Sequence, residues 1–276
     1  MENKIKDFLF KLWVILSGLT IISVTIGVFS YLLYKGFNVI STEFIFGSPK
    51  GIPLGTEGGI FPAIAGSLLS GLLSGLFGGT LGLCTAIYLV FYCENKKVKH
   101  YILQALQCLA GIPSVVIGLF GYSLLIVGLG MHKSLMSASI TLTIMIIPFI
   151  SIRIKKALEE TSNEQFICSL SLGIPKSYTI VKLVIPNAFK YIMTSLGLGI
   201  VFAMGATAPI MFTGAVIISG IPSKLTDPFM ALPYHLYILV NEGLSVDMAY
   251  GTAFVLIVIV LSINLICHFV GNIEDV

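Results

Sequence analysis

Charged residues are scarce in this sequence, where Asp, Glu, Lys and Arg together make up only 11% of 276 residues. A water-soluble domain carries roughly a quarter of its residues as these four types. Hydrophobic residues reach 56%, and the mean hydropathy is +0.99. So few charges cannot cover the surface of a soluble globule. The composition therefore excludes a soluble enzyme, a nucleic-acid-binding domain and a disordered linker, and it indicates a protein that lies in a lipid bilayer.

The sequence also lacks the residue patterns of several kinds of chemistry. The long apolar runs contain no paired carboxylates, and the five cysteines have no metal-ligand spacing. No phosphate-binding loop of the Gly-x-x-x-x-Gly-Lys-Ser/Thr type occurs, so we expect no ATP bound by this chain. Proton- and sodium-coupled carriers commonly use ionisable groups inside the membrane, but the long apolar runs contain no Asp, Glu, Lys or Arg, and the two candidates, His132 and His268, lie near span ends. We therefore expect no catalytic residue, no metal site and no cofactor, and a secondary carrier is the least favoured kind of transporter.

The uncharged residues gather in six long runs. A bilayer's hydrocarbon core requires about 20 apolar residues in a helix, and each run is long enough for one crossing. We predict an all-α polytopic membrane protein with six transmembrane helices in a single domain covering residues 1–276. The expected spans are 12–34, 66–93, 105–130, 134–153, 191–218 and 249–271. The 229–240 segment is too short to span, and its composition predicts a short amphipathic helix.

Lysine and arginine are distributed unevenly between the connections. Twelve lie in the N-terminal segment and in the second and fourth connections, and four lie on the other side. The positive-inside rule therefore predicts a cell-membrane protein with both termini in the cytoplasm. Residues 12–34 are also compatible with a signal peptide, but the run is long and no clear cleavage site follows it. We expect the first span to be retained.

Small residues and prolines interrupt the spans. The second span carries glycine and serine at four-residue spacing, which suits either packing within the chain or a contact with a second subunit. Pro113, Pro148 and Pro209 interrupt three of the spans, where a proline is expected to make a hinge or a broken helix, and broken helices often mark the substrate path of a transporter. Ser114, Thr207 and Thr213 lie beside Pro113 or Pro209 and are candidate pathway residues. Each hydroxyl could equally bond to a backbone carbonyl that proline leaves unpaired.

The segment 154–190 contains a motif that resembles the coupling motif of ABC-importer permeases. Gly173 is followed, after nine residues, by Leu183-Val-Ile-Pro186. The family pattern places Glu-Ala-Ala before the glycine, whereas this chain has Ile167-Cys-Ser169 there. A helix, a turn at the glycine and a second helix would together form a compact knob in this segment. Such a knob can transmit a rigid-body movement. The resemblance implies a type I ABC-importer permease fold, with a cytoplasmic coupling helix between the fourth and fifth spans. Gly173, Leu183 and Pro186 are the residues that would couple it to an ATPase.

Four further stretches resemble phosphate-uptake permeases of the PstA type. The stretches Gly58–Leu68 and Ala110–Gly121 resemble the segment before the second span and the third-span signature of these permeases. Thr207-Ala-Pro-Ile-Met-Phe-Thr213 and the segment from Asp227 to Tyr237 resemble the fifth span and the loop after it. The similarity extends in order from about residue 55 to 270. It implies a subunit of an ATP-driven phosphate importer, with ATP and magnesium bound by other subunits.

The same resemblance names the expected partners. They are a PstC-like permease, a PstB-like ATPase dimer, an external PstS-like phosphate-binding protein and the lipid bilayer, but no nucleic acid. One departure concerns the anion directly, because Phe202 and Ala206 replace the arginine and glutamate that the family usually carries in the fifth span. Two alternatives therefore stay open: a permease for another oxyanion such as sulfate or molybdate, and a membrane scaffold that regulates without transporting.

Overall fold

The computed structural model describes residues 2–51, 55, 57–161 and 163–273 of the chain. Helices dominate this part of the chain, with a two-stranded hairpin near the N-terminal third. The α-helices are α1 (Glu2–Phe37), α2 (Thr42–Phe46), α3 (Phe61–Ile87), α4 (Lys96–Ala110), α5 (Ser114–Gly121), α6 (Leu135–Thr161), α7 (Asn163–Ser171), α8 (Lys176–Thr179), α9 (Ile185–Met204), α10 (Ala208–Thr213), α11 (Leu232–Asn241) and α12 (Val246–Ile273). Three π-helical turns extend or join them: η1 (Tyr88–Tyr92), η2 (Tyr122–Gly128) and η3 (Ile180–Val184). Strands β1 (Pro49–Lys50) and β2 (Glu57–Gly58) pair antiparallel, with Pro49 opposite Gly58.

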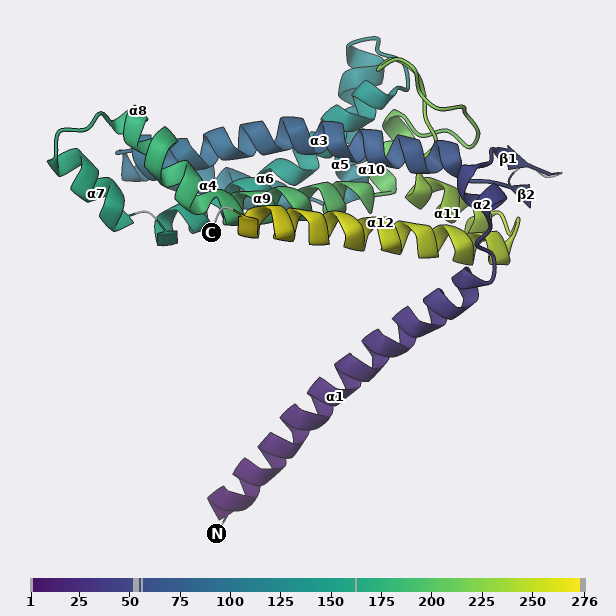
Figure 1. Cartoon of the computed structure of the whole chain (residues 1–276), viewed down its shortest axis with the longest axis horizontal. Helices are drawn as coiled ribbons and strands as arrows, with labels where there is room; N and C mark the ends of the chain where they lie inside the picture. Colours follow the sequence, from purple (N-terminus) through teal and green to yellow (C-terminus); the bar gives the residue numbers. More distant parts are fainter. Residues whose placement is uncertain (1, 52–54, 56, 162, 274–276) are drawn as a thin grey trace.

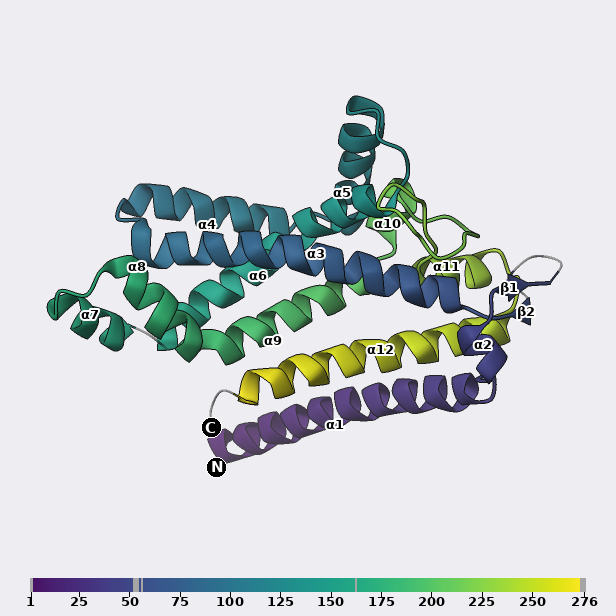
Figure 2. The same cartoon turned by 45° about the horizontal axis from the view of Figure 1, so that its top comes forward.

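The long helices lie side by side along one axis of the molecule (Figures 1 and 2). Helices α3, α6 and α9 pack against one another, and α12 packs on α9. We call one end of this bundle the α7 end, because α7 and α8 lie there, and the opposite end the α11 end, where α2, β1, β2 and α11 lie (Figure 1). The α5–η2 segment stands away from the bundle axis between the two ends (Figure 1).

The core runs along one stripe of α6. Leu142, Ile146, Ile150, Ile154 and Leu158 follow one another at four-residue spacing, and all five are buried. This spacing places them on one face of a helix, where they meet α3 and α9. The stripe continues through Ile154 and Leu158 beyond the uncharged run, which explains why α6 is longer than a single membrane crossing.

Glycines on α3 allow α6 and α9 to approach it closely. A Cβ at Gly78 or Gly82 would lie within 3 Å of the Ile146 or Ile150 side chain of α6. A Cβ at Gly75 would lie 2.3 Å from Ile200 of α9. The row of small residues in the second span therefore serves packing within the chain, which is one of the two roles that the sequence predicts for it.

Five helices in the described residues are long and apolar enough to cross a membrane, and α4 with α5–η2 makes a sixth candidate if the bent pair is one span. Three of the predicted spans differ markedly from the helices of the structure. The helix predicted to end at residue 153 continues to Thr161, and the one predicted over 191–218 runs from Lys176 and ends at Met204. The span predicted over 105–130 is broken between Ala110 and Ser114, with a bend of 98°.

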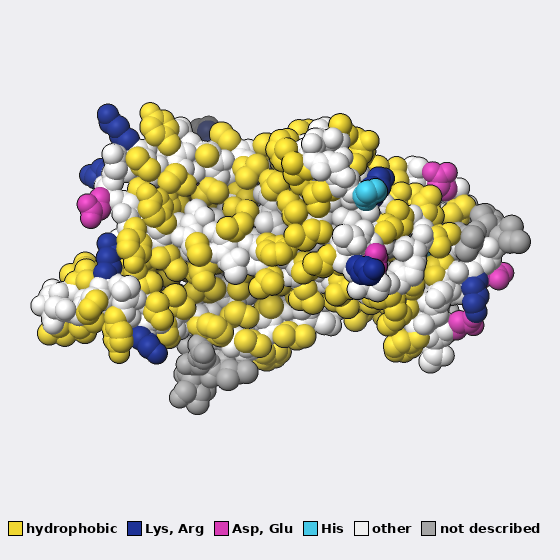
Figure 3. Space-filling model, turned by 90° about the horizontal axis from the view of Figure 1, so that it is seen from above, with side chains coloured by type: hydrophobic (Ala, Val, Ile, Leu, Met, Phe, Trp, Pro, Cys, Tyr) yellow, Lys and Arg dark blue, Asp and Glu magenta, His cyan; other side chains and the backbone are white. Residues whose placement is uncertain are grey.

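The ring contacts of helix α1 with α12, among the described residues, lie near the C-terminal end of α1. Tyr31 packs edge-on against Tyr250 of α12, with ring centroids 5.8 Å apart, and Phe37 contacts Phe254. Its N-terminal part diverges from the bundle (Figure 1) and exposes many large apolar side chains. In the space-filling view, charged side chains lie toward the two ends and in one further group between the middle and the right-hand end, and hydrophobic side chains cover most of the stretch between (Figure 3). Such a surface suits lipid and partner helices.

Helix α11 packs tightly at its end of the bundle. The Leu232 backbone N–H donates to Ser67 Oγ at 2.7 Å, and His235 Nδ1 lies 3.3 Å from Thr252 Oγ1 of α12. His235, Ile238 and Leu239 are buried, whereas Tyr237 and Val240 are exposed, so the helix is amphipathic as the sequence predicts. Burial lowers the pKa of His235 to about 4.

We expect this buried histidine to make the protein less stable in acid. Because its pKa is lowered in the folded state, the unfolded chain binds the extra proton between about pH 6.5 and pH 4, and stability falls as the pH drops through that window. The loss at pH 5 should be about 2 kcal/mol relative to pH 7.

Thermal unfolding of the detergent-solubilised chain at the two pH values measures this loss. His235→Gln should remove most of the pH dependence, and the exposed His100→Gln should leave it intact. Equal pH dependence in the wild type and in His235→Gln would contradict the assignment to His235.

Candidate functional site

Two broken helices meet in the middle of the bundle. The first break separates α4 from α5: α4 ends at Ala110, and Pro113 precedes the first residue of α5 with φ −56°. The second separates α9 from α10: Gly205 ends α9, and Pro209 lies in the first turn of α10. A proline fits the first turn of a helix, where its missing N–H costs nothing, but it ends the preceding one. Both breaks lie at prolines that the sequence marks, whereas the third proline expected to interrupt a span, Pro148, lies inside the continuous helix α6.

The two broken elements touch through a glycine. A Cβ at Gly118 of α5 would lie 2.9 Å from both the Ala208 carbonyl oxygen and the Pro209 Cα of α10. These atoms belong to the backbone, so α5 and α10 pack this closely only because residue 118 has no side chain. Gly118 thus fixes the start of α10 against the middle of α5.

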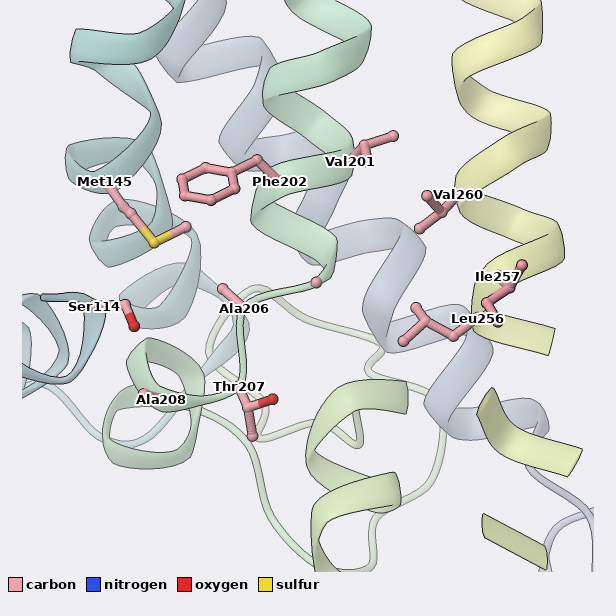
Figure 4. Close-up of a pocket in the computed structure, with 11 residues that line it drawn as sticks. Ser114, Met145, Val201, Phe202, Ala206, Thr207, Ala208, Leu256, Ile257 and Val260 are labelled. Atoms are coloured by element: carbon pink, nitrogen blue, oxygen red, sulfur yellow. The ribbon is translucent and has the colours of Figure 1, made fainter. Parts of the chain in front are cut away.

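A cavity of about 700 Å³ opens where these elements meet α6 and α12. Helix α9 and the break after it contribute Val201, Phe202, Gly205, Ala206, Thr207 and Ala208, and other helices contribute Ser114, Met145, Leu256, Ile257 and Val260. Figure 4 shows the Phe202 ring pointing toward Met145, with Leu256, Ile257 and Val260 on the opposite side. The Phe202 ring also stacks on Phe149 of α6 at a centroid distance of 5.7 Å.

The lining of this cavity is polar only at a few points. Its residues include no Asp, Glu, Lys, Arg or His, and the hydroxyls of Ser114 and Thr207 are its polar side-chain groups. Ser114 is the first residue of α5, and Thr207 precedes the first residue of α10; neither helix has a side-chain cap. Two helix N-termini thus begin at the cavity wall, and such termini attract negative charge through their unpaired N–H groups. The site can offer an anion dipoles and hydroxyls without a fixed charge.

The structure separates the three predicted pathway residues. Ser114 and Thr207 line the cavity together, and the prolines predicted to break helices, Pro113 and Pro209, lie at the two breaks beside them. Thr213 does not belong to this group. It is fully buried, and its hydroxyl donates to the Pro209 carbonyl at 2.8 Å. Thr213 therefore takes the other role that the sequence leaves open, a hydrogen bond to a backbone carbonyl at the proline.

The segment predicted to be the coupling knob is divided differently in the structure. Residues 154–161 extend α6, and α7 leads to a turn in which Gly173 has φ +79°. From Lys176 the chain is helical without interruption to Met204. The half-buried Leu183 and the exposed Pro186 therefore lie in the beginning of this long helix, and not in a separate second helix of a knob.

Several cavity residues carry no signal in the sequence. Met145, Leu256, Ile257 and Val260 are ordinary apolar residues of long helices, and only the packing of α6 and α12 brings them to the cavity. The described residues contain no group of three or more His, Cys, Asp or Glu side chains that could hold a metal ion. In that part of the chain, helix breaks and hydroxyls provide the chemistry of the site.

The arrangement matches solved transporter structures of low sequence identity. A chain of the MetNI methionine ABC transporter in an inward-facing conformation superposes with a TM-score of 0.64 at 16% identity, covering 77% of this chain and 94% of that chain. A chain of a bacterial alginate ABC transporter, solved in complex with an alginate-bound periplasmic protein, gives 0.62 at 15% identity and 92% coverage of both chains. The fold is that of a type I ABC-importer permease, as the sequence predicts.

Sequence comparison identifies the family to which the chain belongs. Residues 78–273 match the binding-protein-dependent transport system inner membrane component family, and the chain belongs to it. The Mycobacterium leprae phosphate transport system permease protein PstA is 30% identical, covering 96% of this chain and 88% of that protein. The Bacillus subtilis probable ABC transporter permease protein YqgI is 25% identical, covering 99% and 97%. The predicted similarity to PstA-type permeases is confirmed, and the chain is a multi-pass protein of an inner-membrane transporter family.

Proposed function

We propose that this chain is the membrane-spanning subunit of an ATP-driven importer of inorganic phosphate, in which it forms one half of the pathway. The observation that carries the proposal is the 30% identity, along 96% of the chain, to a permease named for phosphate transport. The cavity between α5, α9 and α10 fits this role, because its hydroxyls and helix N-termini suit an anion that must also leave.

The cavity supports a pathway shared with a second permease. Its side-chain lining is largely apolar, and no described cationic side chain lines it to neutralise a phosphate. A PstC-like permease facing this surface would complete the pathway and supply the missing charge. The exposed apolar side chains of α5 and η2, among them Val116, Phe120 and Val127, offer a surface for such a partner.

The α7 end supports coupling to an ATPase. Ile167, Leu172 and Tyr178 expose apolar side chains around the Gly173 turn, at the far end of the bundle from α11. A PstB-like ATPase dimer would bind ATP and magnesium and move this turn as a rigid body. The basic residues near α7 put this end, with both termini, in the cytoplasm under the positive-inside rule, so a PstS-like phosphate-binding protein would meet the α11 end.

A substrate competition experiment tests the proposal. Labelled phosphate uptake by the assembled complex in liposomes should fall when unlabelled phosphate is added outside with the binding protein, and equal concentrations of sulfate or molybdate should leave it unchanged. Competition by sulfate or molybdate would favour a permease for another oxyanion. ATP hydrolysis stimulated by the binding protein, without uptake of any of the three anions, would favour a non-transporting scaffold.

A further inference from the structure

A second, smaller hollow of about 270 Å³ lies between α6 and α9 near the α7 end. Its lining differs from that of the large cavity, because all of its residues except one carry a polar or charged group. They are Arg153, Lys156, Ala157 and Glu160 of α6, with Tyr191, Thr194 and Ser195 of α9. We refer to this set as the Arg153 pocket.

Arg153 is the only arginine in the sequence. Its guanidinium carbon lies 5.4 Å from the centroid of the Phe149 ring, which holds the group by a cation–π contact. Lys99 and Lys155 nearby are both paired with Glu159, at 3.3 and 2.6 Å, but Arg153 makes no ion pair with the described residues. Its N–H donors are therefore available to a ligand, and a guanidinium binds the oxygens of a phosphate group in pairs.

The other polar groups of the pocket determine how strongly it would bind an anion. Lys156 adds a second positive charge, and its Nζ lies 3.8 Å from the Glu160 carboxylate in a loose, exposed pair. The Thr194 and Ser195 hydroxyls donate to carbonyls of their own helix at 2.8 and 2.7 Å. The ligand would thus meet two cations and the Tyr191 hydroxyl, opposed by one carboxylate. This balance favours weak, reversible binding.

Stacked aromatic rings lie between Arg153 and the large cavity, because Arg153 contacts Phe149 and Phe149 stacks on Phe202. Met145, Phe149 and Arg153 follow one another at four-residue spacing on α6 and share one face of that helix. Met145 lines the large cavity, and Phe149 stacks on Phe202, which lines it as well. The Arg153 pocket therefore lies along the same α6–α9 contact, closer to the α7 end.

We propose that the Arg153 pocket is a binding site for a phosphate-class oxyanion, held mainly by the Arg153 guanidinium with help from Lys156 and Tyr191. Under the proposed function, it is the site that the anion occupies after it leaves the large cavity and before it is released at the α7 end. The same chemistry suits inorganic phosphate and a phospholipid headgroup, and the experiment distinguishes these two sources.

The single arginine allows a specific test on the full-length purified chain. Phenylglyoxal modifies arginine, so mass spectrometry of the chain reports the reaction of Arg153 alone, and Arg153→Lys gives the background. In maltoside detergent, inorganic phosphate should slow the modification in a saturable manner, relative to chloride at equal ionic strength. Modification at the same rate in phosphate and in chloride, in detergent and in nanodiscs with or without anionic phospholipid, would overturn the proposal.

Charge variants make the test specific to this pocket. Lys156→Gln should raise the half-protecting phosphate concentration about threefold, and Glu160→Gln should lower it about threefold, as expected for exposed charge pairs. Lys224→Gln removes one positive charge from an exposed loop outside the pocket and should leave the value unchanged. Equal effects of Lys156→Gln and Lys224→Gln would show that phosphate acts through general screening, and would overturn the site.

Nanodiscs distinguish the two ligand sources. Protection by phosphate in discs of a neutral glycolipid assigns the site to the free anion. Protection by phosphatidylglycerol, with no further effect of phosphate, assigns it to a lipid headgroup; both results support the site. Uptake assays keep the two proposals separate: phosphate uptake without protection of Arg153 would refute this inference alone, and protection without uptake would refute the proposed function alone.

Discussion

Gly173→Pro is expected to abolish most phosphate uptake while leaving ATP hydrolysis by the assembled complex largely intact. Gly173 lies in the turn after α7 with φ +79°, and a proline ring holds φ near −65°. The glycine N–H also donates to the Leu170 carbonyl at 3.0 Å, and proline removes this bond. The turn must therefore change shape, and α7 must change its direction relative to the helix that begins at Lys176.

A small change in the free energy of the docked state is enough to reduce transport strongly. If the altered turn disfavours the docked state by about 1.4 kcal/mol, coupled transport falls about tenfold. The measurement is the ratio of phosphate imported to ATP hydrolysed in liposomes. Gly243→Pro is the matched control: Gly243 has φ +63° and donates to the Val240 carbonyl at 3.2 Å, but it lies at the α11 end. An unchanged ratio in Gly173→Pro would remove the α7 turn from the coupling role.

Gly118→Ala is expected to lower stability and uptake together. Its methyl group would lie 2.9 Å from the Ala208 oxygen and the Pro209 Cα, and these backbone atoms can move only if α10 moves. Overpacking of this kind costs about 1–3 kcal/mol. Because α10 begins at the cavity wall, its displacement should also reduce uptake by about tenfold, as a misplaced binding group does.

Gly111→Ala is the matched control for this substitution. A Cβ at Gly111 would lie 3.5 Å or more from its neighbours, which is an ordinary contact, and Gly111 belongs to the same broken element. Thermal unfolding and uptake of both variants test the argument. If the two variants behave alike, close packing of α5 on α10 does not define the cavity.

The sequence predicts the helices well because the absence of charge is a direct physical requirement of a bilayer. Helix ends are harder to predict, and α6 and α9 show why. Lys155 pairs with Glu159 at 2.6 Å, one helical turn apart, so the charges that mark the end of the apolar run also stabilise the continued helix to Thr161. The helical stretch that contains α9 similarly begins at Lys176, in α8, and continues through Lys182 and Lys190.

The candidate site could be predicted only in part. Pro113 and Pro209 identify the two breaks, and Ser114 and Thr207 lie beside them in the sequence and in the cavity. No local pattern contains the 98° bend at the first break or the close contact of Gly118 with α10. Thr213, like Thr207, is a threonine close to Pro209 in the sequence, so the sequence cannot distinguish their roles. Only the fold shows that the Thr213 hydroxyl bonds to the Pro209 carbonyl.

ATP-dependent accumulation of phosphate tests the account most directly. The chain is reconstituted in liposomes with a PstC-like permease and a PstB-like ATPase, with labelled phosphate and a PstS-like binding protein outside and ATP inside. Uptake should require this chain, ATP and the binding protein together, and it should stop when any one of the three is omitted. Phosphate accumulation that persists without ATP, or without this chain, would contradict the proposal that the chain forms half of an ATP-driven phosphate pathway.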